Sequence, residues 1–158
     1  MFRDMARKKQ SLDPAQIAQI LTHEKRGVLS VHGENGYPYG LPINYWYNEE
    51  NGCIYFHSGK KGHKIDAIHA DNKVSFCVYD EGFRKDGDWA LNISSVIVFG
   101  KLFVVDDPEK AEDIFRRLSL KFTSDTEYID SEIRNFAAST LCYELRPDHV
   151  TGKIVNES

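Results

Sequence analysis

Residues 28–57, VLSVHGENGYPYGLPINYWYNEENGCIYFH, contain three apolar runs separated by two short polar turns. The runs cover 28–32, 38–47 and 53–57. Their β-branched and aromatic side chains favour strands. Asn35-Gly36 occupies the first turn, and this dipeptide tolerates the positive φ angles that tight hairpins need. Strands joined by such turns pair antiparallel, so the stretch predicts a three-stranded antiparallel meander.

The rest of the chain predicts three more strands and a set of flanking helices. Strands are expected at 73–79, 92–105 and 141–145, with Gly100 as a bulge or bend in the second of them. Helices are expected from the Asp13-Pro14 start to Gly27, over 63–70, after Asp107-Pro108 and over 126–137. Six such strands close most simply as a small barrel, so the fold class is mainly β (α+β), a six-stranded antiparallel barrel.

Size and composition indicate one ordinary globular domain over residues 1–158, with 1–11 as a flexible arm. The chain is 41% hydrophobic and 28% charged. A net charge of −4 disfavours nucleic acid as a partner. No stretch is apolar enough to span a membrane, and the charged N-terminus lacks the apolar run of a signal peptide. A cytoplasmic protein without membrane contact is therefore expected.

Three widely spaced cysteines, Cys53, Cys77 and Cys142, form no C-x-x-C pair. No Cys/His spacing resembles a zinc site, so no metal is expected.

The segment His57-Ser58-Gly59-Lys60-Lys61-Gly62-His63-Lys64 concentrates basic residues in a chain that is acidic overall. Its glycines allow backbone N–H groups to approach a ligand closely, and a predicted helix begins directly after it. A strand, a donor-rich loop, a helix start and a lysine together favour a phosphate site. The spacing differs from the P-loop pattern G-x-x-x-x-G-K-[ST], which disfavours a nucleoside triphosphatase. The alternative interpretation is a solvated basic turn.

Motifs along nearly the whole chain resemble the pyridoxamine 5′-phosphate oxidase-like FMN-binding family, in particular its 5-nitroimidazole resistance branch. The motifs are Gly36-Tyr37-Pro38-Tyr39, Pro42-Ile43-Asn44-Tyr45, Ile54-Tyr55-Phe56-His57-Ser58, Gly62-His63-Lys64-Ile65-Asp66, Lys73 to Val78, Ser94 to Gly100 and His149 to Lys153. The resemblance implies a split β-barrel. It also implies a homodimer with one FMN in each of two clefts at the subunit interface.

The resemblance also implies roles for individual residues. Ser58, His63 and Lys64 match the group that holds the FMN phosphate, within the loop that includes Lys60 and Gly62. Pro42, Ile43, Asn44 and Tyr45 match the strand along the isoalloxazine ring, with His57 at the end of the neighbouring strand. Trp89 and Ser95 match the region that reaches across from the partner subunit.

Several functions stay open at this point. The leading hypothesis is an FMN-dependent oxidoreductase, a nitroreductase-like protein or general flavin reductase, with a small-molecule substrate or an electron donor such as NAD(P)H. The alternatives are a non-catalytic flavin binder or electron carrier, a haem protein with His57 or His149 as axial ligand, and a protein that binds the deazaflavin F420. Ser94-Ser95 replaces the arginine-glutamine pair of the true oxidases, so pyridoxamine 5′-phosphate oxidation is not expected.

Overall fold

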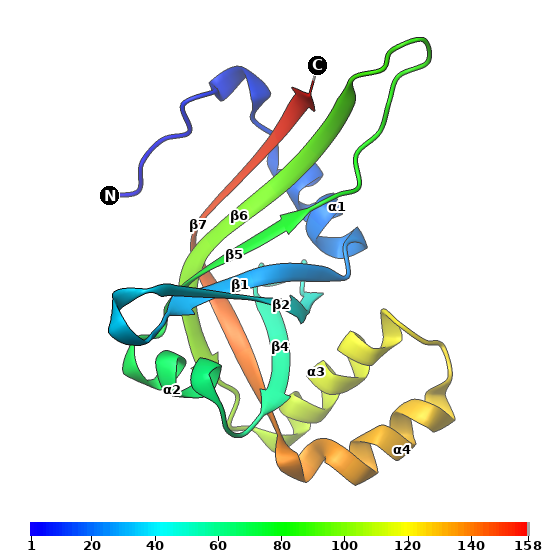
Figure 1. Cartoon of the computed structure of the whole chain (residues 1–158). Coiled ribbons are helices and arrows are strands. Elements are labelled where there is room, and N and C mark those ends of the chain that lie inside the picture. Colours follow the sequence, from blue (N-terminus) through cyan, green and yellow to red (C-terminus); the bar gives the residue numbers. More distant parts are fainter. Residues whose placement is uncertain (158) are drawn as a thin grey trace.

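The structure is a computed structural model that describes residues 1–157 (Figure 1). Its helices are α1 (Pro14–His23), α2 (His63–Ala70), α3 (Pro108–Leu120) and α4 (Thr126–Phe136), with short 3-10 turns at Lys8–Gln10, Glu34–Gly36 and Ala137–Ser139. Its strands are β1 (Arg26–His32), β2 (Pro38–Asn44), β3 (Trp46–Tyr47), β4 (Ile54–Gly59), β5 (Lys73–Tyr79), β6 (Leu91–Val104) and β7 (Thr140–Glu157). The molecule is thus mainly β with flanking helices, as expected.

The strands form one curled antiparallel sheet in the order β2-β1-β5-β6-β7-β4-β3. The six predicted strands are seven, because the expected strand 38–47 breaks at Tyr45. Its first part pairs with β1 and its last two residues pair with β4, at the opposite edge of the sheet. The chain therefore crosses from one edge to the other at this residue, and the barrel stays split between β2 and β4.

Tyr45 marks the break because its side chain is fully buried in the core. The phenol donates a hydrogen bond of 2.8 Å to the Leu21 carbonyl oxygen, and the ring packs edge-on against Phe76 at 5.0 Å. Lys121 lies over the other side of the ring and donates to the carbonyl oxygens of Tyr45 and Glu24. These contacts join the chain crossing to α1 and to the end of α3.

The last strand is much longer than the expected 141–145, since β7 runs from Thr140 to Glu157 beside β6. The register shifts between Phe99 and Gly100, which confirms the predicted irregularity at Gly100. A Cβ at Gly100 would lie 2.3 Å from the Arg146 carbonyl oxygen, so this position requires glycine. The bulge lets β7 continue past Pro147, where the sequence pattern of a strand is interrupted.

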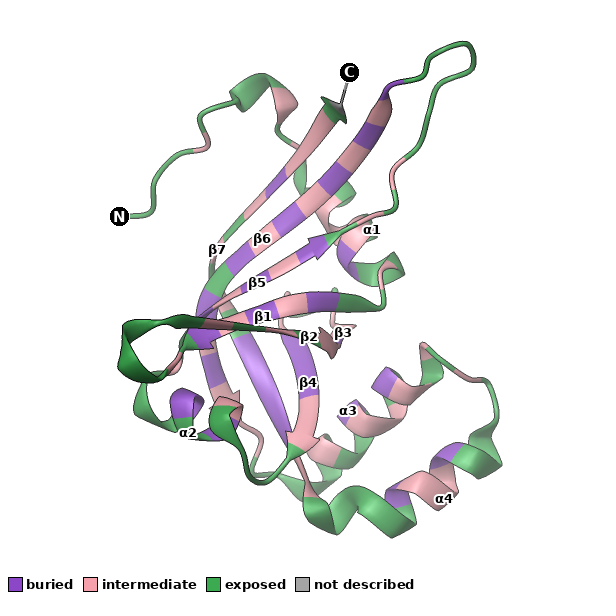
Figure 2. Ribbon diagram, viewed as in Figure 1, coloured by how far each residue is buried: buried purple, intermediate pink, exposed green. Residues whose placement is uncertain are grey.

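Buried and exposed residues alternate along β1, β5 and β6 (Figure 2). The inward side chains form one core whose largest members are Tyr45, Phe56, Phe76 and Tyr143. The other face of these strands carries residues of intermediate exposure and is called the outer face below. This alternation is the period-2 pattern of a sheet with one covered face.

The helices begin where the sequence predicts. Asp13 and Gln16 form a capping box at the start of α1, and Asp107 caps α3. However, α1 ends at His23 and not at Gly27, because the chain turns into β1 at Arg26. Within residues 1–157 no helix has the length and apolarity needed to cross a lipid bilayer.

The expectation of a flexible arm at residues 1–11 stays a prediction. In the structure, Leu12 donates a hydrogen bond to the Gly152 carbonyl oxygen, Ser11 forms a β-bridge with Lys153, and Phe2 stacks on His149.

A buried carboxylate joins β4, β7 and α3. Glu144 Oε2 accepts hydrogen bonds from the Tyr55 hydroxyl at 2.8 Å and from Lys110 Nζ at 2.7 Å, and Oε1 accepts one from Arg146 at 2.6 Å. Burial by itself raises the pKa of the Glu144 carboxyl, but these three donors outweigh it and lower the pKa to about 2. The ionised form is therefore favoured in the folded state more than in the unfolded chain.

This network predicts a specific acid sensitivity. A carboxyl with a depressed folded pKa contributes stability above its unfolded pKa of about 4.3, and the contribution is lost as the pH falls toward the folded value. The free energy of unfolding should therefore fall by about 2 kcal/mol between pH 6 and pH 3 on account of Glu144. Glu144→Gln should lack this component in urea titrations. Glu112→Gln, at an exposed pair with Arg116, should keep the wild-type pH profile; equal profiles for all three proteins would contradict the assignment.

Candidate functional site: a cleft at the split of the barrel

Four of the predicted site residues line one open cavity of about 510 Å³ at the split. Pro42, Ile43 and Asn44 come from β2, and His57 comes from β4. These residues are distant in sequence but adjacent in the fold, because β2 and β4 face each other across the gap that Tyr45 leaves. The structure thus brings the predicted ring-binding strand and the predicted strand-end histidine together.

The free edge of β2 forms one side of this cleft. Because β2 is an outermost strand of the sheet, it pairs only with β1. The main-chain N–H and C=O groups on its other side are not used by the sheet, and such groups can bind a ligand that has matching donors and acceptors. Pro38 and Pro42 interrupt the row of N–H groups, which also protects this edge against pairing with another strand.

Arg26 also lines the cavity, and the sequence analysis missed it. Its Nε donates a hydrogen bond of 2.9 Å to Asn44 Oδ1, and its guanidinium lies 5.9 Å from the centre of the Phe122 ring. The sequence analysis missed Arg26 because it expected the first helix to extend to Gly27. A basic residue in the last turn of a helix does not by itself indicate a binding site. As the first residue of β1, Arg26 instead stands beside the end of β2.

His57 lines the cleft from β4, and Lys64 on α2 lies close enough to His57 to affect its pKa. Burial, followed by the nearby charge of Lys64, lowers the pKa of His57, which favours the neutral imidazole. The His57 ring lies 5.2 Å from that of Phe115 on α3. Burial also lowers the pKa of Lys64. Across residues 1–157, no carboxylate lies within ion-pair distance of Lys64 Nζ.

Partial burial weakens the hydration of the Lys64 ammonium group, and an anion bound beside it would compensate for this loss. Ser58, next to His57 on β4, supplies a hydroxyl group close to the same strand end. Gly62 has a φ angle of +127°, and α2 begins directly after it without a side-chain cap, so the first N–H groups of the helix remain available. This donor set suits a phosphate group, as the sequence predicted.

His63 lies apart from Lys64 in this structure. Its ring stacks on Tyr39 with centroids 4.3 Å apart, and its Nε2 accepts a hydrogen bond of 3.4 Å from the Glu34 N–H. The side chain is therefore engaged with the β1–β2 hairpin. Lys60 is exposed in the loop before α2. The predicted phosphate roles of His63 and Lys60 stay predictions.

Tyr45 does not line the cavity, because the whole residue is buried, its N–H donates to the Lys25 carbonyl oxygen and its own carbonyl oxygen accepts from Lys121. Trp89 lies in the exposed loop between β5 and β6, and Ser95 lies on the outer face of β6. Neither residue lines the cavity within one chain. Their predicted role, contact from a partner subunit, stays a prediction.

A sequence model of the family described as pyridoxamine 5′-phosphate oxidase matches residues 13–154. The chain belongs to this family. No match was found among curated protein sequences.

Solved structures with the same fold include proteins related to flavin and to drug resistance. A candidate 5-nitroimidazole antibiotic resistance protein from Bacteroides thetaiotaomicron is 21% identical, with a TM-score of 0.77; the match covers 92% of this chain and 87% of that one. A FAD-binding protein from Mesorhizobium loti is 20% identical, with a TM-score of 0.69 and coverage of 92% and 97%. A FAD and haem binding protein from Mycobacterium smegmatis is 17% identical, with a TM-score of 0.73 and coverage of 96% and 75%. At these identities the likeness shows the split-barrel fold alone.

The burial of Tyr45 leads to a prediction that separates folding from ligand binding. Tyr45→Phe removes the hydrogen bond to the Leu21 carbonyl and should lower the free energy of unfolding by about 1–2 kcal/mol. The affinity for FMN, the cofactor implied by the resemblance, should stay within about twofold, since the lost hydroxyl faces the core. Urea titration and flavin titration measure the two effects. Tyr47→Phe, which removes no hydrogen bond found among the described residues, is the control; a large loss of FMN affinity in Tyr45→Phe would show that its hydroxyl serves the site.

Proposed function

We propose that this family member binds FMN in the cleft between β2 and β4 and acts as an FMN-dependent oxidoreductase. The observation that carries the proposal is Lys64, a half-buried cation close enough to His57 to lower its pKa and with no acidic partner in the described chain. A phosphate monoester carries close to two negative charges near neutral pH. Binding it would satisfy the charge of Lys64 and stabilise the loop before α2.

The other cleft residues suit the remainder of a flavin. The free edge of β2 offers main-chain donors and acceptors to the polar edge of the ring, and Arg26 holds Asn44 in place at the end of that edge. Pro42 and Ile43 supply apolar surface for the ring itself. When bound, the flavin supplies the electron-transfer chemistry, while the protein binds and orients it and restricts access of water.

The proposal names FMN and not FAD because the resemblance assigns Ser58 and Lys64 to a single phosphate group. Three similar structures are described as FAD-binding proteins, which makes FAD the main competitor. Extraction of the bound ligand followed by mass analysis distinguishes FMN, FAD, F420 and haem.

Catalysis is a separate question from binding. Oxidation of NADH or NADPH by the FMN-loaded protein would support an oxidoreductase, whereas flavin binding without turnover would support an electron carrier. Ser94 is buried and its N–H donates to Asp80 Oδ1, so it contributes to the core on the side away from the outer face. The expectation that pyridoxamine 5′-phosphate is a poor substrate stays a prediction. The cytoplasmic location also stays a prediction.

We further propose that two copies of the chain form a homodimer that completes the cleft. Three large aromatic side chains, Tyr79, Phe83 and Trp89, are exposed at the end of the β5–β6 hairpin. Exposed aromatic clusters are enriched where proteins bind one another. A second copy seated there would cover these rings and bring Ser95 and Trp89 to the neighbouring cleft, as the resemblance implies.

Lys64 should decide the preference for FMN over riboflavin, which has the same ring without the phosphate. Hydrogen bonds to charged groups contribute about 1.5–3 kcal/mol each, so wild type should bind FMN at least about a hundredfold more tightly than riboflavin. Lys64→Ala should weaken FMN by about thirtyfold or more and riboflavin by less than about threefold. Fluorescence titration of the apoprotein at fixed ionic strength measures both affinities.

The matched control is Lys61→Ala, a lysine exposed in the same loop, which should leave both affinities unchanged. Equal binding of FMN and riboflavin by wild type would refute the phosphate site. Equal loss of both ligands in Lys64→Ala would show that the lysine acts on the ring or on the fold.

Trp89 should contribute to the dimer. With FMN present, wild type should be dimeric at micromolar concentration in sedimentation experiments, and Trp89→Ser should raise the dimer dissociation constant by about tenfold or more. Tyr37→Ser is the control, because Tyr37 is 76% exposed and Trp89 is 75% exposed, but Tyr37 lies on the β1–β2 hairpin. A monomeric wild type with FMN bound would contradict the proposed assembly.

A further inference from the structure

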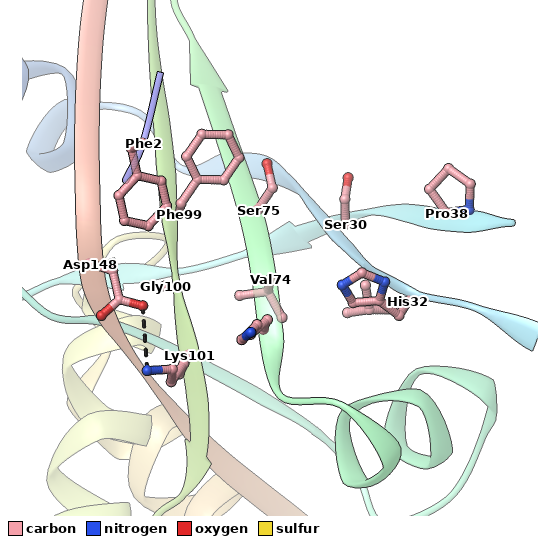
Figure 3. A pocket seen from close by; sticks show the side chains of 12 residues that line it. Phe2, Ser30, His32, Pro38, Val74, Ser75, Phe99, Gly100, Lys101 and Asp148 are labelled. Carbon is pink, nitrogen blue, oxygen red and sulfur yellow. Dashed lines mark ion pairs between the residues drawn. The ribbon is translucent and has the colours of Figure 1, made fainter. Parts of the chain in front are cut away.

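A second cavity opens on the outer face of β1, β5 and β6. It has a volume of about 760 Å³ and shares no lining residue with the cleft at the split. Figure 3 shows its walls, with Phe2 and Phe99 on one side, Ser30 and Ser75 along the strands, and His32 and Pro38 opposite. Its size is that of a small-molecule site, in which a few polar groups converge on a largely apolar surface.

Strand register arranges the apolar and hydroxyl groups in one row. Ser30 pairs with Ser75, and Ser75 pairs with Phe99, so the three side chains lie side by side across β1, β5 and β6. The Phe99 ring is 40% exposed. Within the described chain, neither serine hydroxyl takes part in a hydrogen bond, so both are available to a ligand.

A second row, two residues further along the strands, is cationic. Lys73 pairs with Lys101, and His32 lines the same end of the cavity. Lys101 lies 3.8 Å from Asp148, and His32 lies 3.7 Å from Asp71. Lys73 has no carboxylate within ion-pair distance anywhere in residues 1–157. The two rows are about 6.6 Å apart, because a strand rises about 3.3 Å per residue.

At the Phe99 end of the cavity, the side chain of Phe2 packs against the Phe99 ring. Phe2 stacks on Phe99 with centroids 5.8 Å apart and ring planes 10° apart, and on His149 at 4.8 Å and 2°. Phe2 itself is 46% exposed and belongs to the N-terminal arm. The arm therefore provides a second aromatic wall beside Phe99, and a ligand ring that packs on Phe99 would have to displace Phe2 from this stack.

We propose that this cavity binds a small, flat aromatic acid. The ring packs against Phe99 with Phe2 as the second wall, and the carboxylate reaches Lys73 in the cationic row, with a serine hydroxyl as a further donor. The distance between the two rows matches the length of an aryl carboxylate together with one hydrogen bond from its carboxylate. A flat ring that lies along the strands would therefore span the two rows. The ligand should be an anion, because Lys73 lines the cavity and no carboxylate within the described chain neutralises its charge. The proposal is independent of the flavin site.

The test compares 2-naphthoate with its neutral counterpart 2-naphthamide by isothermal titration of the full chain in saturating FMN. The acid should bind with a Kd below about 1 mM, and the amide should bind at least about fivefold more weakly. Lys73→Gln should weaken the acid by about tenfold and leave the amide within about twofold. Phe99→Leu should weaken both ligands, since it removes the stacking surface that they share.

Lys85→Gln, in the β5–β6 loop, is the control variant and should bind both ligands as wild type does. Absence of binding by the acid would overturn the proposal, and this is also the result expected if a second copy of the chain covers the outer face. Equal affinity for the acid and the amide, or an affinity unchanged in Lys73→Gln, would overturn it as well. Release of FMN by the acid would place the acid in the flavin cleft and so refute a separate site.

Discussion

The burial of the Tyr45 side chain, whose hydroxyl donates a hydrogen bond to the Leu21 carbonyl oxygen, is the constraint on which the architecture depends. It holds the chain inside the core at the point where one edge of the sheet ends and the other begins. A chain held there cannot continue as a strand, so β2 and β3 belong to opposite edges. The sheet curls toward closure but keeps a gap between β2 and β4, and Lys121 adds two hydrogen bonds that join this crossing to α1 and α3.

The gap determines where chemistry can occur. A fully closed barrel would use every main-chain group in its ladder, whereas the split exposes one edge of β2 to a ligand. The same gap leaves Arg26 and Lys64 at its borders without acidic partners among the described residues, while the buried Glu144 elsewhere in the sheet has three donors. The contrast separates a charge that the fold neutralises from charges that it leaves without a partner of opposite sign. It is consistent with a family in which relatives bind flavins.

The outer face has two ends of different character. The β5–β6 hairpin end exposes Tyr79, Phe83 and Trp89, which suits a protein surface as partner. The opposite end has a cavity in which hydroxyl groups and an aromatic ring face a cationic row. β6 connects the two ends, since it starts after the hairpin and contributes Phe99 and Lys101 to the cavity.

The sequence by itself determined the element types, the helix caps, the Asn35-Gly36 hairpin, the irregularity at Gly100 and the family resemblance, because these depend on local chemistry and short spacings. It also led to the prediction that Lys64 and Ser58 belong to a phosphate-binding loop. It did not reveal that the strand at 38–47 breaks at Tyr45, that β7 extends to Glu157 or that Arg26 lines the cleft. The buried position of Tyr45, the pairing of β7 with β6 across a bulge and the approach of β1 to the end of β2 are contacts between distant segments, and only the tertiary structure decides such contacts.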